Sequence, residues 1–113
     1  MKLATIRRFA MRLPEVAEQP HFQYTSFRVR GKIFATAPPE GTHLHVFLDN
    51  GDREQALLMH ATFLEELHWG GKVIGLRVDL SGASLKVVKE LLGRAWTAKA
   101  PKSLLTGLEA ETS

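Results

Sequence analysis

The first thirteen residues show the apolar spacing of an amphipathic helix. Apolar residues recur there three or four positions apart: Leu3, Ile6, Phe9, Ala10 and Leu13. Pro14 is expected to end this helix. The following segment, LPEVAEQPHFQY over residues 13–24, holds two prolines and no regular period, so we interpret it as a crossing loop.

From residue 25 to 36 the period changes to two, which predicts a β-hairpin. A two-residue turn at Arg30–Gly31 would pair Arg28 with Ile33 and Phe27 with Phe34. Glycine at the turn supplies the positive φ that a tight hairpin requires.

Three further segments complete the pattern. HLHVFL at 43–48 alternates and predicts a third strand, with His43, His45 and Phe47 on one face. Residues 52–67 have helical spacing, with Asp52 as the N-cap. KVIGLRVDL at 72–80 alternates most clearly of all, and 85–100 predicts the longest helix, ended by Pro101.

This order of elements predicts an α+β fold. Helix, three antiparallel strands, helix, strand and helix would form a two-layer sandwich, with a mostly antiparallel sheet covered on one face by the N- and C-terminal helices. We expect one domain over residues 1–106 and a mobile tail at 107–113.

Composition restricts the class of protein without naming it. The chain has 113 residues, 44% hydrophobic and 24% charged, and no cysteine, which fits a soluble protein of a reducing compartment and excludes thiolate chemistry. The first fourteen residues are basic and free of acid, as in a mitochondrial presequence, but the sheet needs this helix for cover. We therefore expect a cytoplasmic protein.

Charge is sorted along the chain although the net charge is only +3. No acid occurs in residues 19–39, 67–78 or 91–108. These windows hold eight of the fifteen cations: Arg28, Arg30, Lys32, Lys72, Arg77, Arg94, Lys99 and Lys102. An anionic partner responds to such local potential rather than to net charge.

The tip of the first hairpin carries Arg28, Arg30 and Lys32 around Gly31, with no acid nearby in sequence. Phosphate contact along a nucleic acid is one interpretation, because the arginine fork matches two phosphate oxygens. Protection of an edge strand against aggregation is the other. Pairing with Val29 would place the stem of Lys32 on the apolar face, with its ammonium in solvent.

Two other candidates each allow two interpretations. His43 and His45 point the same way and would share a metal with a third histidine, or are simply outward-facing polar residues. Trp69 before Gly70–Gly71 would stack on a base, or fold over the turn to shield the end of the sheet.

Three sequence blocks resemble the MmcQ/YjbR-like family: LPEVAEQPHF…SFRVRGKIFAT, HWGGKVIGLRVDL and AWTAKAPKSLL. The resemblance implies a frataxin-like (CyaY-like) fold and DNA binding through two projecting hairpins, the double wing. It assigns Arg28, Arg30, Gly31 and Lys32 to the first wing, and Trp69, Gly70, Gly71, Lys72 and Arg77 to the second. Glu15 and Ile74 depart from the family pattern, which commonly has glycine and an aromatic residue there.

We therefore expect a monomeric, non-enzymatic DNA-binding protein that contacts the phosphate backbone with little base readout and needs no cofactor or metal. The adjacent Glu65 and Glu66 diverge on a helix, and no nucleophile motif occurs. Neutralising about four phosphates of a duplex would give a slope of log K against log salt of roughly −3.6. The alternative is a protein-interaction or anionic small-molecule-binding module that uses Phe47 and the histidines, and a third possibility is a purely structural scaffold.

Overall fold

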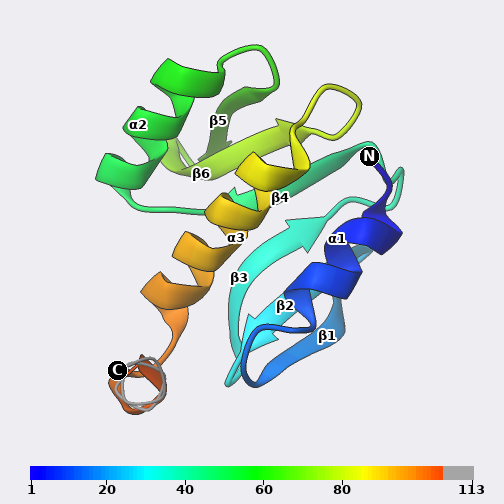
Figure 1. Ribbon diagram of the computed structural model, residues 1–113, viewed down its shortest axis with the longest axis vertical. Helices are drawn as coiled ribbons and strands as arrows, with labels where there is room; N and C mark the ends of the chain where they lie inside the picture. Colours follow the sequence, from blue (N-terminus) through cyan, green and yellow to red (C-terminus); the bar gives the residue numbers. More distant parts are fainter. Residues whose placement is uncertain (106–113) are drawn as a thin grey trace.

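The computed structural model describes residues 1–105, and this part of the chain contains one antiparallel sheet packed with helices (Figure 1). The elements in chain order are α1 (Leu3–Ala10), β1 (Val16–His21), β2 (Tyr24–Val29), β3 (Lys32–Ala37), β4 (His43–Phe47), α2 (Asn50–His60), β5 (Leu64–Trp69), β6 (Lys72–Asp79) and α3 (Leu85–Lys99). The tail expected at 107–113 lies outside the described residues. No helix within residues 1–105 is long and apolar enough to span a bilayer.

The six strands have the order β1-β2-β3-β4-β6-β5, and every neighbouring pair is antiparallel. Figure 1 shows α1 and α3 on the same side of the sheet. Helix α3 packs against β3 and β4, α1 packs against α3, and α2 contacts β5. The predicted α+β fold, with helices from the two ends of the chain against an antiparallel sheet, is confirmed.

The core lies between the sheet and the helices because alternate strand residues point toward the apolar helical stripes. The fully buried side chains include Phe27, Val29, Leu44, Val46, Leu76, Val78 and Leu92. Trp96 of α3 is 2% exposed, and its indole nitrogen donates to the Pro14 carbonyl oxygen at 3.0 Å. This contact fixes the segment after α1 against α3.

Two secondary-structure predictions were wrong. Residues 16–21 form strand β1 rather than a loop, since their backbone pairs with β2 while most of their polar side chains stay exposed. Pro20 is tolerated because β1 is an edge strand. Helix α2 ends at His60, and residues 64–69 form β5, which the Gly70–Gly71 turn pairs with β6.

The N-terminus of α2 also differs from the prediction. The helix begins at Asn50 after Asp49, so Asp52 lies in the first turn rather than at the N-cap. Its carboxylate instead accepts a hydrogen bond from Arg94 of α3 at 2.9 Å. An acid in the first turn is still favourable because the helix dipole is positive there.

The first hairpin largely follows the predicted register. Arg28 pairs with Ile33, and both Arg30 and Gly31 have positive φ values, 48° and 82°, as a type I′ turn requires. The pairing of Phe27 with Phe34 was wrong. A β-bulge between Phe27 and Arg28 adds one residue to β3, so Phe27 pairs with Ala35 instead.

Candidate nucleic-acid interface on the open face of the sheet

The face of the sheet opposite the helices carries a row of polar residues. The strand registers align Ser26, Thr36, His45, Arg77 and Glu65 side by side across β2, β3, β4, β6 and β5. A row of this kind arises because strand neighbours in register share a face. The row crosses five of the six strands, so it forms the floor of the open face.

A cavity of about 570 Å³ lies over this floor, within the range of about 300–1,000 Å³ usual for ligand sites. Thr36 and His45 contribute polar groups to it. The other lining residues are mostly apolar or aromatic: His21, Phe22, Tyr24, Ile33, Phe47, Leu67, His68, Trp69 and Ile74. They come from both ends of the sheet, so the outer hairpins β1–β2 and β5–β6 form opposite walls of one hollow.

Large aromatic rings at the rim of this cavity are exposed to solvent. Phe22 is 92% exposed, Trp69 77% and Tyr24 38%. The interpretation that Trp69 folds over the turn to shield the sheet was therefore wrong. Stacking of Trp69 on a base stays a prediction, and its side chain is exposed to a partner at the rim.

Phe22 and Tyr24 were not among the predicted site residues, because residues 13–24 were interpreted as a loop. The signal that would have found them is the two-residue spacing between His21 and Tyr24, which pair across the β1–β2 turn. Tyr24 also meets the His45 ring edge to face, with ring centroids 5.9 Å apart. Recognising β1 would have placed Phe22 at the tip of a hairpin.

His45 is the polar group at the centre of the floor. Its Nε2 atom is buried and has no hydrogen-bond partner among the described residues. Burial lowers the pKa of His45, and the charges of Arg77 and His43 lower it further against a smaller opposite effect of Glu40. The imidazole is therefore neutral near pH 7, and its tautomer decides whether Nε2 donates or accepts.

His43 and His45 point to the same face, as predicted, since they are two residues apart on β4. Within residues 1–105, no group of three or more histidine or carboxylate side chains gathers as metal ligands would. The Asp79 carboxylate, across from His43, accepts hydrogen bonds from the Ser81 hydroxyl and backbone N–H. These two bonds lower the pKa of Asp79.

The cations of the first hairpin fall into three situations. Arg28 lies on the open face, and its Nε donates to the Ser26 hydroxyl at 3.0 Å. Arg30, at the turn, donates to both carboxylate oxygens of Glu15, at 3.0 and 2.8 Å. Lys32 is exposed but pairs with buried Val29, so it starts from the helix-covered side.

The expectation of an unbalanced hairpin tip is therefore wrong for Arg30. The acid comes from the loop before β1, fifteen residues away in sequence. This pair, with its hydrogen bond as the larger cause, lowers the pKa of Glu15 and raises that of Arg30. At neutral pH the two charges largely cancel.

The predicted site residues of the second hairpin lie at its turn and on the open face. Gly70 and Gly71 have φ values of 56° and 81° and form the turn. Lys72 is directly across from Trp69, so it shares the cavity side, and it has no ion pair or hydrogen bond within residues 1–105. Arg77 lies in the polar row and donates to Glu65 at 2.9 Å.

The fold thus gathers Arg28, Lys72 and Arg77 on the open face, from two different hairpins. Arg77 is neutralised by Glu65. Lys32 points from the other face, and Arg30 is paired at the turn. Of the predicted site cations, Arg28 and Lys72 therefore remain on the face that holds the cavity without an acid partner among residues 1–105.

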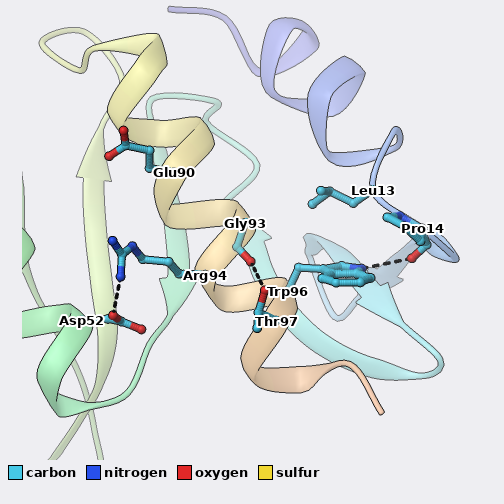
Figure 2. A pocket seen from close by; sticks show the side chains of 8 residues that line it. All are labelled: Leu13, Pro14, Asp52, Glu90, Gly93, Arg94, Trp96 and Thr97. Carbon is cyan, nitrogen blue, oxygen red and sulfur yellow. Dashed lines mark hydrogen bonds and ion pairs between the residues drawn. The ribbon is translucent and has the colours of Figure 1, made fainter. Parts of the chain in front are cut away.

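A second hollow, on the helix side, offers a contrast (Figure 2). It lies along α3, with Leu13, Pro14 and Trp96 on one side of the helix and Arg94 with Asp52 on the other. Its hydrogen-bonding groups are largely paired with each other: Arg94 with Asp52, Trp96 with Pro14, and the Thr97 hydroxyl with the Gly93 carbonyl. It offers less to a ligand than the open face does.

Fold and site together define a small α+β protein whose six-stranded antiparallel sheet has one face covered by helices and one face open and hollowed. A family model for YjbR matches residues 11–98. The chain belongs to the YjbR family, which confirms the resemblance carried by the three sequence blocks.

The structure is also similar to the crystal structure of the Deinococcus radiodurans protein DR2400, described with a DUF419 domain. The TM-score is 0.72 at 18% sequence identity, and the match covers 84% of this chain and 75% of that chain. At this identity the similarity shows the fold alone. No curated protein matches the chain.

Proposed function

We propose that this protein binds nucleic acid, acting by binding alone, with Arg28 and Lys72 holding phosphates on the open face of the sheet. The observation that carries the proposal is that these two cations, which have no acid partner in the described part of the chain, lie on the same face as exposed aromatic rings. Phosphate contacts supply most of the affinity in non-specific nucleic-acid binding, and aromatic rings on a sheet are a common platform for bases.

This placement revises the double-wing expectation in one respect. A wing lying along a groove would use the tips of both hairpins, including Arg30 and Lys32. Arg30 is held by Glu15, and Lys32 starts from the helix-covered side. The open face therefore supports binding better than the two tips do.

A pair of lysines tests this difference. Lys32 and Lys72 are each the first residue of the strand after a type I′ turn, and both are exposed. Binding of a labelled single-stranded oligonucleotide is measured by fluorescence anisotropy over a range of salt concentrations. Each phosphate contact to a single strand contributes about −0.7 to the slope of log K against log salt, so Arg28 and Lys72 together give about −1.4.

We expect Lys72→Ala or Arg28→Ala to reduce this slope to about −0.7, while Lys32→Ala leaves it unchanged. An equal reduction of the salt slope in Lys32→Ala and Lys72→Ala would show that the phosphates contact the hairpin tips, and would overturn the assignment to the open face. Binding that does not depend on salt would overturn the nucleic-acid proposal itself. Lys86→Ala is a control for the loss of one positive charge, because Lys86 is an exposed residue of α3.

The alternative from the sequence, a protein-interaction or anionic small-molecule-binding module, concerns the same face with Phe47 and the histidines. The cavity over His45 is the observation that favours a small ligand. A thermal shift with a mononucleotide or an anionic metabolite, and none with any oligonucleotide, is the result that this second candidate predicts.

A further inference from the structure

The cavity on the open face has properties that backbone binding alone leaves unused. Phosphate contacts need only cations, yet the hollow between the outer hairpins is walled by apolar side chains and rimmed by aromatic rings. Its walls include Ile33 and Leu67, which would be in water if the face only met phosphates. A flat, partly apolar ligand suits such walls better than a charged one does.

The two most exposed rings of the rim lie on different hairpins. Phe22 is at the β1–β2 turn and Trp69 is at the end of β5, and both line the same cavity. Single-stranded nucleic acid presents unstacked bases that stack on such rings, whereas a duplex keeps its bases stacked internally. The rim therefore favours a single strand.

The floor supplies one unpaired polar group. The Nε2 atom of His45 is buried and has no partner among the described residues. The His45 ring lines the cavity. Because its Nε2 atom is closed to solvent, a base edge reaches it only when a neighbouring side chain such as Tyr24, whose ring meets the imidazole edge to face, moves aside. The base then offers both donors and acceptors, which suits either tautomer of the imidazole. An aliphatic ligand would leave the same atom unpaired.

The positions of Arg28 and Lys72 indicate how a nucleic-acid strand would lie across the cavity. Lys72 is directly across from Trp69, and Arg28 is across from Ile33, so each cation is next to a residue that lines the cavity. Phosphates on both sides of an inserted base would meet a cation at either wall. A strand crossing the sheet satisfies this condition, as it follows the row from β2 to β5.

We propose that the cavity binds one unpaired base of a single-stranded nucleic acid, stacked at Phe22 and Trp69 and hydrogen-bonded at its edge by His45. This proposal rests on the proposed function, because Arg28 and Lys72 hold the phosphates of the same strand. It adds a strand preference and a base pocket to a surface that otherwise binds only the backbone.

The test compares two labelled strands of equal length, one with bases and one with an abasic site at every position. Both carry the same phosphates, so the ratio of their affinities isolates the contribution of the bases. We expect the strand with bases to bind the wild-type protein about tenfold more tightly. Base insertion should also quench Trp69, since the only other tryptophan, Trp96, is buried.

Phe22→Gly is the informative variant, because the turn keeps a residue suited to the positive φ of 57° and the fold is retained. Together with Trp69→Ala it should reduce the affinity ratio of the two strands to near one, without changing the salt slope. Leu58→Ala is the matched control: Leu58 is 87% exposed on α2, outside the cavity. It should leave both quantities unchanged.

The outcomes separate the two proposals. If neither strand binds at low salt, the proposed function is refuted. Equal binding of both strands by the wild-type protein would refute the base pocket and leave backbone binding intact. Quenching of Trp69 by a nucleoside monophosphate, without a preference for the strand with bases, would assign the cavity to a free ligand and also overturn the base pocket.

Discussion

Glu65 limits the positive charge of the open face, so its removal should strengthen binding. Its carboxylate accepts a hydrogen bond from Arg77 at 2.9 Å, and the side chain of Glu65 is 63% exposed while that of Arg77 is 41% exposed. Glu65→Gln removes the negative charge and keeps the shape of the side chain. Arg77, in the polar row beside His45, then becomes a third cation able to contact phosphate.

The magnitude follows from the number of contacts. Two contacts, from Arg28 and Lys72, give a slope of about −1.4 for a single strand, and a third should make it about −2.1. A fourfold decrease in salt would then raise the affinity of Glu65→Gln relative to wild type by about 2.6-fold, which is four to the power 0.7. Fluorescence anisotropy at 50 and 200 mM salt, roughly the range over which such slopes are measured, resolves this difference.

Glu18→Gln is the matched control. Glu18 accepts a hydrogen bond from Arg7 of α1 at 2.6 Å, and it pairs across the sheet with buried Phe27, so it lies on the helix-covered side. The substitution changes the net charge by the same amount as Glu65→Gln. An equal increase in slope for the two variants would show that net charge governs binding, and would refute the assignment of the phosphates to the open face.

Three further predictions concern stability. Gly75→Ala should destabilise the fold by about 3 kcal/mol in urea denaturation, because an added Cβ would overlap the Val46 carbonyl oxygen; unchanged stability would contradict this close approach. Gly93→Ala should stabilise it by about 0.5–1 kcal/mol, since a Cβ there, inside α3, meets nothing within 4 Å. The pKa of His45 is lowered in the folded state, so the unfolded chain takes up this proton more readily; the free energy of unfolding should fall as the pH drops below about 6.5, and less steeply in His45→Gln.

The sheet and the last helix could be predicted because burial leaves a strong period in the sequence. Leu44 and Val46 alternate with polar neighbours on β4, and α3 has an apolar stripe. Strand β1 leaves no such signal. Its side chains are mostly exposed on an edge, and only its backbone hydrogen bonds to β2 define it.

The candidate site was predictable as a list of residues but not as a charge distribution. Arg30 and Arg77 stand in windows free of acid, yet the fold brings Glu15 and Glu65 to them from fifteen and twelve residues away. The cavity could not be predicted from the sequence, for a related reason. It depends on two outer hairpins forming opposite walls, and one of these hairpins includes the strand whose sequence has no period.

Backbone strain distinguishes Phe22 from other exposed apolar residues. Three residues other than glycine have positive φ within residues 1–105, namely Glu15, Phe22 and Arg30. Glycine would adopt these conformations without strain, so each side chain is retained at some expense of stability. Glu15 and Arg30 bind each other, which gives both a role within the fold.

Phe22 has no comparable internal role. A left-handed conformation costs such a residue about 1–2 kcal/mol relative to glycine. Phe22 is 92% exposed, and within residues 1–105 its one ring contact is the edge contact with His21. Leu58 is almost as exposed but lies in a helix, so its exposure carries no strain. Strained residues whose strain is not offset by contacts within the fold are concentrated at functional sites. The ring of Phe22 is therefore best explained by a contact with another molecule, and it lies at the rim of the cavity.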